Sequence, residues 1–253
     1  MKDAGEKNPQ PMKQHEQPAT TIVGLSPARL LALSDGVFAV AITLLVLNIK
    51  LPAYAGTLND QKLLEALIHI GPLYLSYILS VLIIGAYWVA HHGLFHYIRR
   101  SDRILLWLNI LFLTCVTFIT FPAALLGLYW YNRVAVIAYG GSLALTGLVF
   151  DAIRWYATSN CRLVDKDLDP LLNRSAMLRN LVGPFIYILA IGIALLPIQV
   201  YGIDSTRLSI ILYVIVPIFY ILPGRIDLYW VRHPGDTSTP GRIMHLWRHK
   251  QEN

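Results

Sequence analysis

Six apolar segments are the feature that most constrains this chain. They cover about residues 30–49, 72–95, 104–128, 133–156, 179–198 and 207–223, close to the roughly 20 residues that a helix needs to cross a bilayer core. Hydrophobic residues make up 55% of the 253 residues, and charged residues only 14%. This composition argues against a soluble protein. The sequence therefore predicts an all-α, polytopic membrane protein with six transmembrane helices.

A shorter amphipathic segment precedes the second span. Residues 61–70, QKLLEALIHI, place apolar side chains on one helical face but are too few to cross a membrane. The Gly71-Pro72 pair is predicted to begin the second span, because a proline is tolerated in the first turn of a helix. We therefore expect a disordered cytosolic tail at 1–28, a six-helix domain at 29–223 and a cytosolic C-terminal tail at 224–253.

The basic residues are distributed unevenly around these spans. Seventeen of the 21 Lys and Arg residues fall in the two tails and in the 2–3 and 4–5 connections. The positive-inside rule then predicts that both termini are cytoplasmic, in a multi-pass protein of the cell membrane. The net charge of +6 is explained by this orientation and by contact with anionic lipids, so no nucleic-acid partner is expected.

Motifs for enzymatic chemistry are not found in the sequence. Cys115 lies in the third span and Cys161 in a cytosolic connection, so neither a disulfide nor a paired metal-ligand motif is expected. The chain has no Walker loop, GxSxG or HExxH sequence. A histidine-metal enzyme would need several histidine boxes, and this chain has one histidine cluster. We therefore predict no enzymatic activity, no metal and no cofactor.

The first span carries a stripe of apolar and hydroxyl side chains. At about 100° per residue, Val40, Thr43, Leu44 and Leu47 lie within about 100° of arc on one helical face. Ser34 and Asp35 lie off this stripe and are expected to point toward neighbouring helices. A charge inside a span is costly and usually finds a partner within the protein.

The second span offers such partners at the same depth, in the sequence YWVAHHGLFHYIRR at 87–100. Together with the first span it predicts a buried polar network made of Arg29, Ser34, Asp35, Trp88, His91 and His92. The residues leave two roles open: a network that only locks the helices together, or a proton relay or pH sensor, because imidazoles near a carboxylate titrate in a useful range.

The opening of the first span, RLLALSDGVFAVAITLLVL at 29–47, resembles the RxxxFSD signature of the lysosomal potassium channel family called transmembrane protein 175, in particular its prokaryotic six-helix members. The similarity continues through YWVAHH at 87–92, RSDRILLWLNILFL at 100–113 and Phe121-Pro122. One departure is Leu33, where the motif has phenylalanine, which affects a packing contact more than the fold.

This resemblance implies a homotetramer in which the first helices line a central pore that conducts K⁺ without a carbonyl filter loop. The family's isoleucine constriction falls on Val40, its threonine layer falls on Thr43, and further apolar layers fall on Leu44 and Leu47. Valine is one methylene smaller than isoleucine, so a wider neck could weaken cation discrimination.

Two other functions are compatible with the same residues. A proton-coupled carrier or proton-permeable pathway would also use Asp35 and the second-span histidines, although carriers commonly have inverted repeats and broken helices. A structural or lipid-binding scaffold is the third alternative.

Overall fold

The fold is described by a computed structural model over residues 26–51, 59–164, 170–196, 199–200 and 203–221. Five helical segments in these ranges are long and apolar enough to cross a membrane, and α8 (Ser205–Ile221) is a shorter apolar helix at the sixth predicted span. The all-α prediction with six apolar helices is confirmed. The two predicted tails lie almost entirely outside the described residues.

The first span contains two kinds of helix. The α-helix α1 (Pro27–Leu44) begins with a proline, and the tighter 3₁₀ helix η1 (Leu45–Asn48) follows directly, so the α-helix ends earlier than the predicted residue 49. The Asn48 side-chain amide donates to the Thr120 carbonyl at 3.0 Å. This contact anchors the end of the first span to the third span.

The amphipathic helix and the second span form as predicted. The helix α2 (Asp60–His69) starts at Asn59, whose side chain accepts a hydrogen bond from the Lys62 amide. The long helix α3 (Gly71–Tyr97) begins at the Gly-Pro pair.

The third span is divided into α4 (Arg103–Phe118) and α5 (Thr120–Leu128). Pro122 has no N–H for the carbonyl of Phe118 one turn earlier, so the helical hydrogen-bond ladder is interrupted at this point. The Asp102 side chain accepts from the Leu105 amide and caps the start of α4.

The rest of the chain forms an outer group of helices. It contains α6 (Arg133–Thr158), the short 3₁₀ helix η2 (Ser159–Cys161), α7 (Pro170–Leu195) and a two-stranded hairpin of β1 (Gln199–Val200) and β2 (Ile203–Asp204), which leads into α8. The helix α7 begins at Pro170, before the predicted residue 179. The prediction followed the apolar run alone, and the first turns of the helix contain polar residues that lie outside this run.

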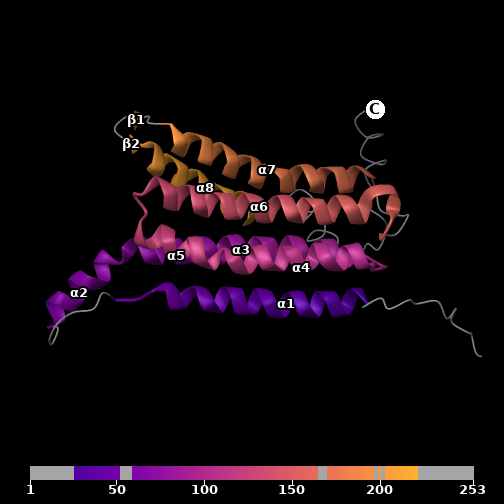
Figure 1. Ribbon diagram of the computed structural model, residues 1–253, viewed down its shortest axis with the longest axis horizontal. Coiled ribbons are helices and arrows are strands. Elements are labelled where there is room, and N and C mark those ends of the chain that lie inside the picture. Colours follow the sequence, from indigo (N-terminus) through magenta and orange to yellow (C-terminus); the bar gives the residue numbers. More distant parts are fainter. Residues whose placement is uncertain (1–25, 52–58, 165–169, 197–198, 201–202, 222–253) are drawn as a thin grey trace, which may run out of the picture.

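The helices stack in layers along one common direction (Figure 1). The helix α1 lies along one outer side, α3, α4 and α5 lie in the middle, and α6, α7 and α8 lie on the far side. Within the outer group the backbones approach closely: a Cβ added to Gly147 on α6 would lie 2.5 Å from the Pro184 ring on α7. This arrangement leaves one side of α1 uncovered by the other described helices.

The 2–3 and 4–5 connections meet at one end of the bundle. Ile98 pairs with Val164 in a β-bridge, and the Arg99 amide donates to the Leu163 carbonyl at 2.9 Å. The Tyr156 hydroxyl donates to the Asp102 carboxylate at 2.5 Å. Both connections therefore lie on the same side, as the charge distribution requires.

Candidate pore-lining helix

The face of α1 and η1 that carries the predicted stripe is exposed in the single chain. Val40, Leu44 and Leu47 are 54%, 46% and 62% exposed, and Thr43 between them is also exposed. On the opposite face, Phe38 and Leu45 are buried against the core. The four predicted stripe residues therefore share one open face, although Leu47 belongs to the 3₁₀ turn.

The Thr43 hydroxyl is oriented by its own helix. Its Oγ1 lies 2.9 Å from the Val40 carbonyl and 3.0 Å from the Ala39 carbonyl, so its proton is donated to the backbone. The lone pairs of the oxygen then remain available as acceptors on the exposed face. At this position the side chain offers oxygen, the kind of atom that can replace water around a cation.

Small residues lie on the same open face, closer to the start of α1. Gly36 and Ala39 are both exposed, and a Cβ built on Gly36 would meet no atom within 4 Å. The packing inside one subunit therefore does not require a glycine here. Leu33, which replaces the phenylalanine of the signature, is 51% exposed on α1.

A buried chain of hydrogen bonds joins α1, α3 and α4. His91 Nε2 donates to Asn109 Oδ1 at 2.9 Å, Asn109 Nδ2 donates to Ser34 Oγ at 3.0 Å, and Ser34 Oγ donates to the Leu30 carbonyl at 2.9 Å. All three polar side chains are fully buried. Two of them, Ser34 and His91, were predicted from the sequence.

Asn109 is the residue of this buried chain of hydrogen bonds that was not predicted from the sequence. The signal was an amide in the middle of an apolar run, LLWLNILFL, where a polar group needs an internal partner. His91 is also enclosed by aromatic rings, with ring centroids 4.2 Å from Phe95 and 5.5 Å from Phe112. The His91 imidazole therefore packs in an aromatic environment, and its hydrogen bond goes to Asn109 and not to Asp35.

Asp35 forms a second, separate contact nearer the surface. The Trp88 indole donates to Asp35 Oδ1 at 2.8 Å, and the His92 ring lies 5.7 Å from the Trp88 ring. Arg29 is exposed, and among the described residues no hydrogen bond or ion pair joins it to Asp35. The six predicted residues therefore separate into three parts. Ser34 and His91 belong to the buried chain of hydrogen bonds, Asp35 and Trp88 form a surface pair with His92 beside it, and Arg29 lies apart from both. They separate because successive residues of α1 face different neighbours.

No group of three His, Cys, Asp or Glu residues able to hold a metal ion occurs within the described ranges. The arrangement on α1 has hydroxyl and apolar side chains, with no nucleophile or general base next to them. It is suited to contact with a permeating ion or with another apolar surface.

Known proteins are similar to this chain in sequence and in fold. A family model described as the endosomal/lysosomal potassium channel TMEM175 matches residues 29–120. A potassium channel of Streptomyces collinus is 38% identical over 170 residues, which are 66% of this chain and 81% of that protein. This chain belongs to the TMEM175 family.

A solved TMEM175 structure has the same fold. The crystal structure of a lysosomal potassium-selective channel TMEM175 homolog from Chamaesiphon minutus superposes with a TM-score of 0.64 at 30% identity, covering 78% of this chain and 96% of that chain. A TMEM175 protein of Gallus gallus, named an endosomal/lysosomal proton channel, is 42% identical over 97 residues, 36% of this chain and 19% of that protein. The chain is therefore a multi-pass ion channel of the TMEM175 family and not an enzyme.

Proposed function

We propose that this protein is a potassium-preferring cation channel whose pore is lined by the α1 helices of four identical subunits. The observation that carries the proposal is the open stripe of Val40, Thr43, Leu44 and Leu47 on a helix whose opposite face, with Phe38 and Leu45, is packed into its subunit. Two relatives with a similar chain are named as potassium channels, in Streptomyces collinus and Chamaesiphon minutus.

Small residues support the assembly through α1. Gly36 and Ala39 are exposed, and within the described residues a Cβ on Gly36 would meet no atom within 4 Å. Small residues let helices in a membrane approach closely, where van der Waals contact replaces the hydrophobic driving force. A second copy of α1 would fit against this part of the helix.

The proposed constriction combines apolar rings with a ring of hydroxyls. Rings of Val40, Leu44 and Leu47 side chains would exclude water from a narrow neck and present a barrier to hydrated ions. A ring of Thr43 oxygens would partly replace the water around a cation. Because K⁺ gives up its water more easily than Na⁺, this site would favour K⁺ without a rigid carbonyl cage.

Membrane orientation follows from the charge distribution. The connections joined by the Ile98–Val164 bridge carry eight of the seventeen basic residues on the predicted inner side. We place this end of the bundle, and both termini, in the cytoplasm of a cell whose surface membrane holds the channel.

The test is a recording from the purified protein in a planar bilayer with K⁺ on one side and Na⁺ on the other. We expect single-channel steps and a reversal potential displaced toward the K⁺ equilibrium potential. Val40→Trp should abolish the current. The control is Val89→Trp, at an exposed position on α3, which should leave the current unchanged. Equal permeability of the two ions, or block by the Val89 change alone, would contradict the proposal.

Proton permeation is the second candidate function. It is favoured by the 97-residue match to the Gallus gallus protein named as a proton channel, and by Asp35 with its Trp88 and His92 neighbours near the surface. Liposomes without K⁺ but with a pH gradient and an internal pH dye would measure it. Acidification that persists in the Val40→Trp variant would place a proton pathway outside the proposed pore.

A further inference from the structure

Aromatic side chains gather at the end of the bundle opposite the bridge between the 2–3 and 4–5 connections. The connection between α5 and α6, residues 129–132, has the sequence YWYN. Tyr129 and Tyr131 are exposed, and Trp130 is half-buried. The end of α7, the hairpin of β1 and β2, and the start of α8 lie at the same end (Figure 1). Trp and Tyr are enriched where a membrane meets water, so this end lies at the level of the lipid headgroups.

Two arginines from different helices lie at this connection. The Arg207 guanidinium, on α8, lies over the Trp130 ring at 5.5 Å from its centroid, which is a cation–π contact. Arg133, the first residue of α6, donates from Nη1 to the Leu195 carbonyl at the end of α7, at 3.4 Å. We call Trp130, Arg133 and Arg207 the tryptophan–arginine cluster. Contacts with neighbouring elements therefore hold both arginines at this end of the subunit.

Both guanidinium groups are accessible to a further partner. Arg133 is exposed, and its contact with Leu195 uses one of the five N–H donors that an arginine carries. The Arg207 side chain is 55% exposed, and its Nε lies 4.0 Å from a carboxylate oxygen of Asp204, which is half-exposed. An ion pair at this distance and exposure contributes little. Together with Asp204, the cluster carries two positive charges and one negative charge, so it attracts anions.

Basic residues are scarce on this side of the membrane. On the orientation proposed above, four of the 21 Lys and Arg residues lie outside: Lys50, Lys62, Arg133 and Arg207. Two of the four belong to the tryptophan–arginine cluster, whereas Lys50 follows η1 and Lys62 lies on α2. Because outer connections are normally poor in basic residues, orientation does not account for two arginines beside one aromatic ring. An anionic partner at the membrane surface does account for them.

Exposed apolar side chains lie next to the cluster. Val134 follows Arg133 directly on α6 and is 69% exposed, and Leu195, whose carbonyl Arg133 binds, is 57% exposed. The helices α6, α7 and α8 form the side of the subunit away from α1, so this surface remains open to lipid when α1 faces other subunits (Figure 1). A phospholipid combines the two matching chemistries, a phosphate for the arginines and acyl chains for the apolar side chains.

We propose that the tryptophan–arginine cluster binds the phosphate of a membrane phospholipid. Arg133 and Arg207 donate to the phosphate oxygens, because the planar guanidinium group matches the geometry of a phosphate. Trp130 lies at the headgroup level, and the acyl chains lie against Val134 and Leu195. The site is separate from the open stripe on α1 and does not depend on the proposed pore. Only its assignment to the outer leaflet rests on the proposed orientation.

Native mass spectrometry of the full-length protein in detergent tests this proposal and requires neither ion current nor a known orientation. The delipidated protein is mixed with phosphatidylglycerol or with a galactosyl diacylglycerol, which has the same acyl chains but no phosphate. We expect the wild type to retain several-fold more phosphatidylglycerol than galactolipid. Equal retention of the two lipids would overturn the proposal.

Two double variants that remove the same charge from the same side locate the site. Arg133→Gln with Arg207→Gln should lose phosphatidylglycerol several-fold, whereas Lys50→Gln with Lys62→Gln should retain it like the wild type. Equal losses in the two variants would show attraction by surface charge alone, and full retention in the arginine variant would place the lipid elsewhere; either result overturns the proposal. If the arginine variant does not fold, Arg207→Gln and Lys62→Gln are compared singly by the same criterion.

Discussion

Asn109 connects three helices through one side chain. It accepts from His91 on α3 and donates to Ser34 on α1, while its own backbone belongs to α4. The amide can serve both partners because it carries a donor and an acceptor on the same planar group. The position of α1, and with it the direction of its open stripe, therefore depends on a neutral residue in the membrane interior.

We predict that Asn109→Ala destabilises the protein more than any single change at the surface pair of Asp35 and Trp88. It leaves Ser34 and His91 with unused polar groups in a dry core, at a cost of about 1–3 kcal/mol for each. Thermal unfolding of the purified protein measures this effect. Thr114→Ala is the control, because the Thr114 hydroxyl bonds only to its own helix and is exposed.

Trp88→Phe should lower the stability of the protein less than Asn109→Ala does. The change removes the indole donor to Asp35 but keeps an aromatic ring beside His92, and the contact is exposed on the subunit and not enclosed in its core. We expect a loss of roughly 0.5–1.5 kcal/mol at most. A melting temperature lowered more by Trp88→Phe than by Asn109→Ala would show that the surface pair, and not the buried chain, holds α1 in place.

Most helices could be predicted because an apolar run that crosses a membrane can form only one kind of secondary structure, a helix. A backbone in hydrocarbon must satisfy its own polar groups, so an apolar run of about 20 residues forms a helix whatever its neighbours are. The change to a 3₁₀ turn at Leu45 could not be predicted in this way, because it accompanies a contact between Asn48 and Thr120, which are far apart in the sequence.

The candidate site was predictable to a similar extent. The stripe of Val40, Thr43, Leu44 and Leu47 follows from helical periodicity, and the structure exposes these residues together. Which polar residues join one another does not follow from periodicity, because it depends on the rotation of three helices about their axes. For this reason the predicted network includes Arg29 and omits Asn109.

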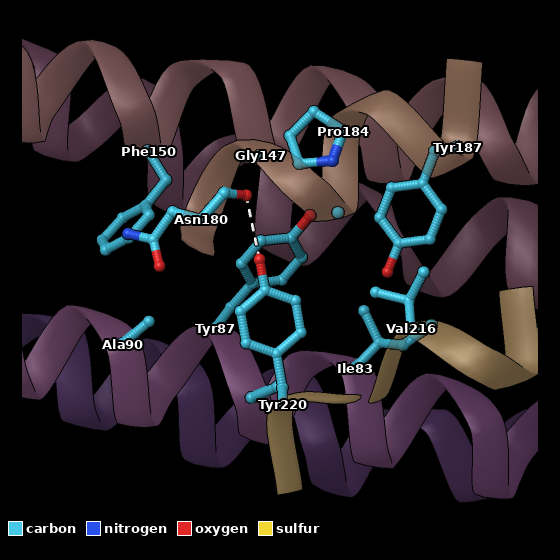
Figure 2. Close-up of a pocket in the computed structure, with 12 residues that line it drawn as sticks. Ile83, Tyr87, Ala90, Gly147, Phe150, Asn180, Pro184, Tyr187, Val216 and Tyr220 are labelled. Carbon is cyan, nitrogen blue, oxygen red and sulfur yellow. Dashed lines mark hydrogen bonds between the residues drawn. The ribbon is translucent and has the colours of Figure 1, made fainter. Parts of the chain in front are cut away.

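At Pro184 of α7, α8 supplies the hydrogen bond that the proline removes (Figure 2). Pro184 has no N–H for the Asn180 carbonyl, and the Tyr220 hydroxyl donates to that carbonyl instead. We predict that Tyr220→Phe costs about 0.5–1.5 kcal/mol in the wild type. In a Pro184→Ala background the restored backbone N–H should make this cost smaller.

A double-mutant cycle measures this coupling through thermal or denaturant unfolding of the four proteins. Equal costs of Tyr220→Phe in both backgrounds would show that the hydroxyl does not compensate for the proline. Tyr213→Phe is a suitable comparison, because the Tyr213 hydroxyl donates to the Val136 carbonyl on a different helix.

For the whole molecule, the distribution of charge predicts that both tails face the cytoplasm. Cysteines introduced singly as Gln10→Cys and His245→Cys, in a background without Cys115 and Cys161, should not react with a membrane-impermeant thiol reagent added to intact cells. They should react after the cells are opened. Labelling of either position from outside would reverse the proposed orientation.

The central claim is that the open face of α1 lines a pore in which Thr43 favours K⁺. The most direct measurement is the reversal potential of Thr43→Ala in asymmetric K⁺ and Na⁺, beside the wild type and the buried-face variant Phe38→Ala. We predict that Thr43→Ala still conducts but that its reversal potential moves toward equal permeability, because the oxygen ring is lost. Phe38→Ala should lower stability, by about 3–5 kcal/mol, and leave the reversal potential of the remaining channels unchanged. An unchanged reversal potential in Thr43→Ala, or a change confined to Phe38→Ala, would contradict the account.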